Sequence, residues 1–203
     1  MTQPKAVIFD LGKVLVDFDY RIAARRIAAR GTMPAAEVQT WIDHSPLLFR
    51  FETGRITKEQ FFAGVQAATG FRGTIEEFSQ LFADIFTPIE PMVKLQADLR
   101  ERGVPTYIFS NTNELAVRHI RQHFPFFSRF DGYILSCEHG AMKPEPHLYA
   151  VVEEETGCRG NELFYTDDRP ENIQAAAERG WQAILHETPD KTRKAIQAAG
   201  LLS

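Results

Sequence analysis

Several polar side chains in this sequence of 203 residues come at the ends of short apolar runs. They are Asp10, Ser110, Asn111, Asp167 and Asp168. A carboxylate in such a place, Asp10 first of all, can act as a nucleophile or a metal ligand, although a lone Asp caps a helix just as readily. Ser110 and Asn111 offer a hydroxyl and backbone N–H groups at the start of a predicted helix, which suits an anion. Together these residues predict an anion site beside a reactive carboxylate.

Two further features concern the charge of that site. Asp167 and Asp168 would add negative charge beside Asp10, which raises the pKa of the carboxyls unless a cation lies between them. Mg²⁺, a hard ion that takes oxygen ligands, would relieve the repulsion. Lys143, in Met142-Lys143-Pro144, could neutralise an anion in the same crevice. A lone Lys before Pro is ordinarily solvated surface, so Lys143 by itself carries no weight.

The elements that must position these groups alternate along the chain. Short apolar runs predict strands at residues 5–9, 104–109, 133–135, 163–165 and 181–185. Helical patterns that stop at Gly or Pro lie between them, at residues 92–102, 113–123, 146–156 and 171–179. The alternation predicts an α/β fold with a doubly wound parallel sheet, which binds ligands outside the carboxyl ends of its strands.

Residues 17–88 interrupt this pattern, because the strand signal disappears and the segment is typical of successive helices. Capping boxes begin at Thr57 and Thr74, each with Gln or Glu three residues later. Nine of the 16 phenylalanines lie here, and those at helical spacing predict the core of a small bundle. They include Phe49, Phe51, Phe61, Phe62, Phe78 and Phe82. We therefore predict an α/β core of residues 1–16 and 89–203 with a helical insertion at 17–88.

Composition excludes several classes of protein. With 44% hydrophobic, 25% charged and 11% aromatic residues, the chain is typical of a packed globular protein. Its 23 Lys and Arg against 27 Asp and Glu give a net charge of −4, which argues against nucleic acid as the main partner. Cys137 and Cys158 are expected to be reduced thiols. Because no segment is long and apolar enough for a signal peptide or a membrane span, we expect a cytoplasmic protein.

Four motifs carry a resemblance to a known family. They are Val7-Ile8-Phe9-Asp10-Leu11-Gly12-Lys13-Val14-Leu15-Val16-Asp17, Phe109-Ser110-Asn111, Lys143-Pro144 and Asp167-Asp168-Arg169-Pro170-Glu171-Asn172-Ile173. With these four motifs in this order, the sequence closely resembles the haloacid dehalogenase-like hydrolase superfamily over nearly its whole length. It is most similar to the branch with epoxide-hydrolase phosphatase-like domains and bacterial sugar-1-phosphate phosphatases, such as that for alpha-D-glucose 1-phosphate. Residues 17–88 resemble the family's helical cap of the first type, C1.

The resemblance implies a Mg²⁺-dependent phosphatase that forms an aspartyl-phosphate and acts on a small phosphorylated metabolite. Asp10 would be the nucleophile, and Lys143 with Ser110 and Asn111 would bind the phosphoryl oxygens. The metal ligands would be Asp10, the backbone carbonyl of Gly12 and Asp168. Asp167 would support them, as would Asn172, which lies four residues after Asp168 where the family often places a second acid.

One position departs from the family pattern. Most phosphatases of the superfamily carry a second Asp two residues after the nucleophile as general acid and base, and this chain has Gly12 there, followed by Lys13. Such acid–base help is worth about 10²–10⁴-fold. Without it, substrates with good leaving groups, such as anomeric sugar phosphates, are expected to react best, unless Lys13 or a side chain of the insertion supplies the proton.

Three hypotheses therefore stay open. The favoured one is the phosphatase. A 2-haloacid dehalogenase also lacks the second Asp, but it needs no metal and has no use for the pair Asp167-Asp168 beside the nucleophile. A non-catalytic phosphometabolite-binding protein would keep the fold, yet has no need of a nucleophile. His44, Glu52 and Arg55 in the insertion are candidates for substrate contact, and either a monomer or a homodimer is expected.

Overall fold

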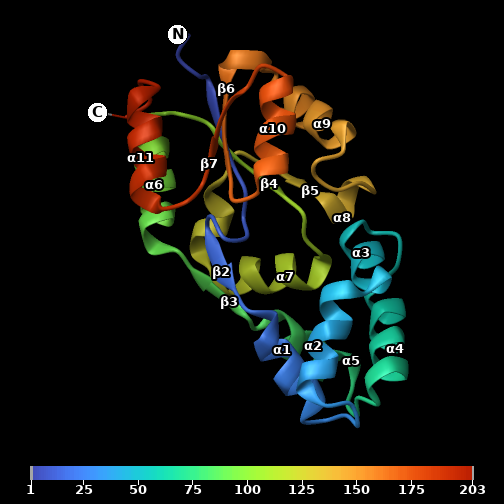
Figure 1. Cartoon of the computed structure of the whole chain (residues 1–203). Coiled ribbons are helices and arrows are strands. Elements are labelled where there is room, and N and C mark those ends of the chain that lie inside the picture. Colours follow the sequence, from blue (N-terminus) through green and yellow to red (C-terminus); the bar gives the residue numbers. More distant parts are fainter. Residues whose placement is uncertain (1, 203) are drawn as a thin grey trace.

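The computed structural model describes residues 2–202 and places a five-stranded parallel sheet at the centre of the larger part of the chain (Figure 1). Its strand order is β5-β4-β1-β6-β7. The bounds are Ala6–Phe9 for β1, Thr106–Ser110 for β4, Gly132–Leu135 for β5, Leu163–Asp167 for β6 and Gln182–Leu185 for β7. All four neighbouring pairs are parallel. The α/β prediction is confirmed, since β1 lies between β4 and β6 and the three strands end at one edge.

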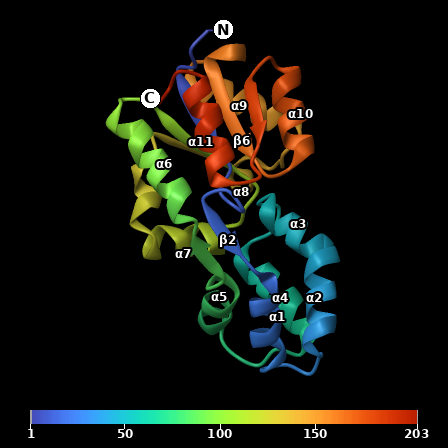
Figure 2. The same cartoon turned by 60° about the vertical axis from the view of Figure 1, so that its left-hand side comes forward.

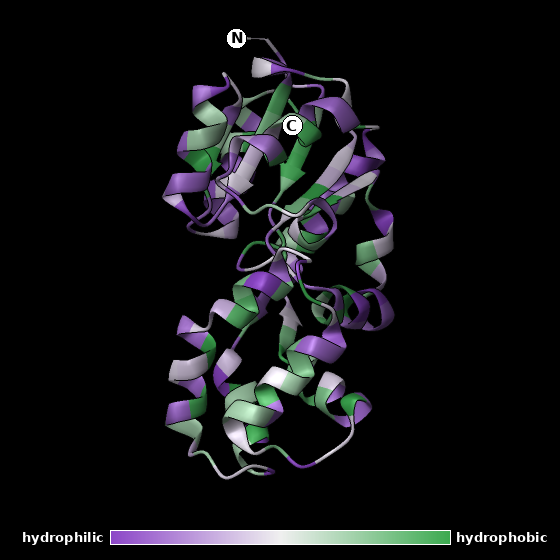
Figure 3. Ribbon diagram, turned by 90° about the vertical axis from the view of Figure 1, so that its right-hand side faces the viewer, coloured by the Kyte–Doolittle hydropathy of each residue, from purple (hydrophilic) through white to green (hydrophobic). Residues whose placement is uncertain are grey.

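Helices cover both faces of this sheet. Successive residues of β1 point to opposite faces and all are apolar, so each face offers a hydrophobic surface. Val7 and Phe9 pack with α6 (Glu90–Glu101) and α11 (Pro189–Ala198). Ala6 and Ile8 pack on the opposite face with α9 (Pro146–Thr156) and α10 (Pro170–Glu178). Figures 1 and 2 show these helix pairs on either side of the strands, and Figure 3 shows green, hydrophobic strands at the centre of the sheet and purple residues on the helices around them.

Five further helices form a separate bundle, which we call the helical insert. They are α1 (Tyr20–Ala28), α2 (Ala35–His44), α3 (Pro46–Glu52), α4 (Lys58–Thr69) and α5 (Ile75–Ala83). Both predicted capping boxes form, at Thr57 and at Thr74. The core of the insert is aromatic: Phe61, for example, stacks on Phe51 with ring centroids 4.4 Å apart and meets Phe82 edge-on at 5.2 Å.

A two-stranded antiparallel pair joins the insert to the rest of the chain, β2 (Val16–Phe18) with β3 (Phe86–Pro88). The helix α7 (Glu114–His123) lies between the sheet and the insert in Figure 1 and contributes to both cores, through Ile120 on the sheet side and Leu115 on the insert side. The remaining elements are α8 (Ser136–His139) and two short 3-10 helices, Pro125–Arg129 and Gly160–Glu162.

Some local predictions were wrong. Phe49 is 44% exposed, because it lies two residues before buried Phe51 on the same helix and therefore on nearly the opposite side. The strands β2 and β3 and the helix α11 were not predicted from the sequence. None of the helices within residues 2–202 combines the length and the apolar character needed to cross a membrane.

Candidate active site

The predicted groups meet at the carboxyl ends of the three central strands. Asp10 follows β1, Ser110 is the last residue of β4, and Asp167 is the last residue of β6. The backbone N–H of Asp10 donates to Thr166 O at 3.0 Å, which fixes the loop after β1 against β6. A cavity of about 410 Å³ opens above these ends. Its lining includes Asp10, Gly12, Ser110, Asn111, Lys143, Asp168 and Asn172.

Lys143 connects the carboxylates. Its side chain is 1% exposed, and its Nζ lies 2.9 Å from Asp10 Oδ1 and 2.6 Å from Asp167 Oδ2. Nζ also donates to Phe109 O at 2.8 Å. Burial disfavours the charged amine, but the two carboxylates outweigh it and raise the pKa of Lys143. Lys143 is therefore a buried ammonium at the base of the cavity, and not the surface residue that its sequence context alone indicates.

Asp167 is fully buried and has all its side-chain oxygens engaged. Its Oδ1 accepts from Asn172 Nδ2 at 3.0 Å and from the Arg169 N–H at 2.8 Å. Its Oδ2 accepts from Lys143 and from the Tyr165 hydroxyl. Burial works against its ionisation, yet the Lys143 ammonium lowers the pKa of Asp167 below its ordinary value. Asn172 thus helps to hold the Asp167 side chain in place.

Asp10 differs from Asp167 in that only one of its oxygens is held. Oδ1 accepts from the Leu11 N–H at 2.7 Å and from Lys143, whereas Oδ2 has no hydrogen-bond partner among residues 2–202. Burial raises the pKa of Asp10 to about 7. The Lys143 ammonium lowers this pKa, but the charge of Asp167 raises it and offsets part of that effect. Burial and Asp167 likewise raise the pKa of half-buried Asp168.

This cluster fits a divalent cation. Carboxylate oxygens of Asp10, Asp167 and Asp168 lie within 4.8 Å of one another. The Lys143 ammonium contacts Asp10 and Asp167 but forms no ion pair with Asp168, so a hard cation beside the three carboxylates would help to balance their charge. Gly12 lines the same cavity, and its carbonyl is the further oxygen ligand that the resemblance implies. The donor set is the oxygen-only type that Mg²⁺ takes.

Two more predicted residues have different surroundings. The side chain of Asn111 exchanges two hydrogen bonds with the backbone of Lys143, accepting from its N–H at 2.7 Å and donating to its carbonyl at 3.0 Å. Its amide thus holds the Lys143 loop against the end of β4. Ser110 is 3% exposed, and its hydroxyl makes only a long contact of 3.4 Å with Asn111 O. The Ser110 hydroxyl is therefore the freer of the two to meet a ligand.

An aromatic ring lies beside the position of the missing acid. A Cβ built on Gly12 would lie 2.8 Å from Phe18 Cε1, so the Phe18 ring would have to shift to admit a side chain there. Lys13, the next residue, has a φ of 59°, and its ammonium bonds to Asp17 Oδ1 and to Phe18 O at 2.8 Å. Neither residue therefore brings an acid to Asp10 from this loop.

Of the three candidates in the insert, Glu52 alone lines the cavity above Asp10. His44 is exposed at the end of α2, and Arg55 donates to Gly140 O at 3.4 Å and lies over the exposed ring of Phe49. Tyr165, whose hydroxyl bonds to Asp167, was not predicted as part of the site, although its spacing from Asp167 could have indicated it. It lies two residues before Asp167 on one strand and therefore on the same face of the sheet.

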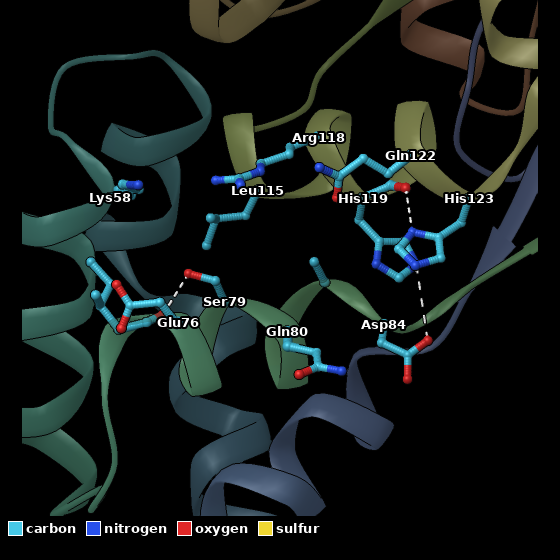
Figure 4. Close-up of a pocket in the computed structure, with 12 residues that line it drawn as sticks. Lys58, Glu76, Ser79, Gln80, Asp84, Leu115, Arg118, His119, Gln122 and His123 are labelled. Carbon is cyan, nitrogen blue, oxygen red and sulfur yellow. Dashed lines mark hydrogen bonds and ion pairs between the residues drawn. The ribbon is translucent and has the colours of Figure 1, made fainter.

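A larger cavity of about 590 Å³ lies elsewhere, between α5 and α7 (Figure 4). His119 and His123 stack in it with ring centroids 4.2 Å apart, and His119 Nε2 lies 3.9 Å from Asp84. A third cavity, about 710 Å³, is lined by Phe51 and Arg118 among others. Neither contains any of the strand-end groups, so the smaller cavity at Asp10 is the one with the chemistry.

Comparisons with known proteins agree with this geometry. The sequence model of the haloacid dehalogenase-like hydrolase family matches residues 4–180. The chain is 25% identical over 193 residues to a D-ribitol-5-phosphate phosphatase of Bacteroides thetaiotaomicron, covering 90% of this chain and 92% of that protein. It is also 25% identical over 175 residues to a sesquiterpene phosphatase of Aspergillus oryzae, covering 85% and 84%.

The fold is shared with solved structures. A haloacid dehalogenase-family enzyme of Bacteroides thetaiotaomicron superposes with a TM-score of 0.81 at 24% identity, over 92% of this chain and 95% of that one. The same enzyme has been solved with magnesium and inorganic phosphate, and that structure superposes with a TM-score of 0.79 at 24% identity, over 91% and 94%.

Proposed function

We propose that this chain, which belongs to the haloacid dehalogenase-like hydrolase family, is a Mg²⁺-dependent phosphomonoesterase that works through an aspartyl-phosphate on Asp10. The observation that carries the proposal is the arrangement of Asp10. One of its oxygens is held by Leu11 and Lys143, the other is free of protein partners among residues 2–202, and two more carboxylates lie beside it. That is the setting of a nucleophile next to a metal.

Each residue has a distinct task in this proposal. Asp10 attacks phosphorus, with Lys143 orienting its Oδ1 and favouring its ionised form. Lys143 and the Ser110 hydroxyl bind the phosphoryl oxygens, and Asn111 holds the Lys143 loop in place. When bound, Mg²⁺ would be held by Asp10, Asp168 and the Gly12 carbonyl, with Asp167 and Asn172 in support, and it supplies charge that neutralises the phosphoryl group.

The helical insert, within residues 17–88, is proposed to act as a lid over this cavity. The two connections through β2 and β3 lie at its ends and are the natural hinges. Closure would exclude water from the phosphoryl site and bring insert residues to the substrate. Exchanging the insert for a related one should therefore change which esters are hydrolysed while Mg²⁺-dependent hydrolysis of a small generic ester remains.

The substrate is proposed to be a small phosphorylated metabolite, with sugar 1-phosphates as the first compounds to test. Relatives named as D-ribitol-5-phosphate and sesquiterpene phosphatases support the class of reaction but differ in the molecule that carries the phosphate. A cavity of about 410 Å³ limits the choice to small molecules or to the phosphorylated end of a longer one.

The test is a screen of sugar phosphates, nucleotides and acyl phosphates with Mg²⁺ and with chelator, run beside a chloride-release assay on 2-haloacids. Phosphate release that chelator abolishes supports the proposal. Chloride release without metal would instead identify a dehalogenase. A protein that binds phosphorylated metabolites without turnover would be the non-catalytic member of the fold.

A further inference from the structure

We infer that Glu52, at the end of helix α3 in the helical insert, is the general acid and base of the reaction, in place of the acid that Gly12 cannot supply. The inference rests on the proposed phosphatase function. Glu52 and Gly12 line the same cavity of about 410 Å³ as Asp10, but they belong to different parts of the chain. The ring of Phe18, also part of the lining, lies against Gly12 and would have to shift to admit a side chain there.

At the end of α3, neighbouring residues point in different directions. Phe51 is 1% exposed and stacks on Phe61 within the core of the insert. Glu52 is the last residue of the helix and lines the cavity on the other side. Thr53, 1% exposed, closes the helix by bonding its hydroxyl back to Phe49 O at 2.9 Å. The position of the Glu52 backbone is thus fixed within the insert.

Contacts with α8 fix the same segment against the core. The Ser136 hydroxyl, at the end of β5, lies 2.6 Å from Glu52 O. Gly54 has a φ of +65°, and a Cβ there would lie 2.1 Å from Cys137 O, so only glycine allows this close approach. The Arg55 guanidinium reaches Gly140 O. These contacts hold the end of α3 against α8, and Glu52 lines the cavity above the strand ends.

The surroundings of Glu52 suit proton transfer. Its carboxylate makes no ion pair or hydrogen bond with the side chains of residues 2–202, and burial raises its pKa to about 7. Titratable neighbours on the packed elements are Tyr20 of α1 and Cys137 of α8, whose own pKa values are raised by burial and further by the Glu52 charge. Across the cavity lie Asp10, Lys13, Lys143, Asp168 and Arg169. A group with a pKa near the working pH is the most effective proton donor and acceptor.

The two half-reactions then balance. In the first, an Asp10 oxygen attacks phosphorus, the bond from phosphorus to the leaving oxygen breaks, and that oxygen takes the electron pair and the proton of the Glu52 carboxyl. In the second, water attacks the aspartyl-phosphate and gives its proton to the Glu52 carboxylate. The bond between phosphorus and Asp10 breaks, the electron pair returns to Asp10, and inorganic phosphate leaves.

The experiment measures how the rate depends on the leaving group. Wild type, Glu52→Gln and Glu52→Asp are assayed for kcat/KM with Mg²⁺ on aryl phosphates of graded leaving-group pKa. Glu37→Gln is the matched control, since Glu37 is an exposed carboxylate of α2 in the same insert. For wild type and Glu37→Gln we expect kcat/KM to depend only weakly on the pKa of the leaving group. Glu52→Gln should lose about 10²–10⁴-fold on the poorest leaving group, much less on the best, and so show a steep dependence.

Two further readouts separate proton transfer from a structural role. Glu52→Asp, which keeps a carboxyl group, should retain a shallow dependence at a reduced rate. Because the second step also lacks its base in Glu52→Gln, the aspartyl-phosphate should accumulate with good leaving groups, and the mass of the acid-quenched protein would show it. Thermal unfolding checks that each variant is folded.

Other outcomes are decisive. If Glu52→Gln loses kcat/KM equally on all substrates, the proposed role of Glu52 is overturned but the phosphatase function stands. The same holds if kcat/KM of wild type already depends steeply on the pKa of the leaving group. If wild type releases no phosphate in a Mg²⁺-dependent way, the proposed function itself fails.

Discussion

Replacing Glu52 by Gln should make the protein more stable above neutral pH and leave its stability unchanged in acid. Burial raises the pKa of Glu52 from 4.5 to about 7. Between these values the folded state holds a proton that the unfolded chain has lost, so this residue's contribution to stability falls as pH rises. Gln has nearly the same shape and no charge to bury. The variant therefore avoids the cost that wild type bears when Glu52 ionises in the cavity.

The size of the effect follows from the shift. Each unit of pKa difference corresponds to about 1.4 kcal/mol, so a rise from 4.5 to about 7 sets an upper limit of about 3–4 kcal/mol. Glu52 faces a cavity open to solvent, which screens the charge and reduces the expected gain to about 1–2 kcal/mol. For a chain of this length, each kcal/mol moves the melting temperature by about 2–4 °C.

Urea unfolding at several pH values between 5 and 8.5, with chelator and without phosphate, measures the effect. The quantity of interest is the free energy of unfolding of Glu52→Gln minus that of wild type, because other titrating groups cancel in the difference. It should grow with pH and level off above about pH 8, whereas the same difference for Glu37→Gln should stay flat. A Glu52→Gln difference that does not change with pH would refute a buried, near-neutral Glu52.

Three other variants test the proposed site. Asp10→Asn should abolish phosphate release while the circular dichroism spectrum stays that of wild type, because an amide cannot attack phosphorus; normal turnover would remove Asp10 as the nucleophile. Asp168→Ala should raise the Mg²⁺ concentration needed for activity steeply, and an unchanged Mg²⁺ titration would show that the ligand is wrong. Lys143→Met leaves two buried carboxylates without their ammonium and should lower the free energy of unfolding by about 3–5 kcal/mol in chelator; urea unfolding with and without Mg²⁺ measures this, and a loss below 1 kcal/mol would contradict it.

The sheet could be predicted because its strands are buried on both faces. Residues 6–9 are apolar at successive positions, a pattern typical of a buried strand when helical segments follow at regular intervals. The β2–β3 pair could not be predicted in the same way. It has three residues in each strand and joins segments about 70 residues apart, so local propensity says little about it. Phe49 was misplaced because a short helix with Phe at alternate positions can bury only one of the two.

The main groups of the site were predictable for a topological reason. Parallel neighbours end at the same edge, so residues that follow β1, β4 and β6 converge whatever their separation along the chain. The sequence could not predict which contacts those groups make. Nothing local indicates that the Asn111 amide would bond to the Lys143 backbone, or that Asp167 would be the carboxylate saturated by Tyr165, Asn172 and Lys143.

The lack of an acid at Gly12 and the proposed acid at Glu52 are related, because the second would compensate for the first. A glycine at position 12 offers no side chain to protonate the leaving oxygen, and the Phe18 ring lies against this glycine. A donor at Glu52 would be in place only while the end of α3 rests on α8, through Ser136 and Gly54. On the proposed role of Glu52, proton transfer would depend on this contact, and water reaching a site in which it is broken would meet Asp10 without that acid or base beside it. An acid on the insert would thus couple the chemical step to closure, which an acid at position 12 of the core would not do.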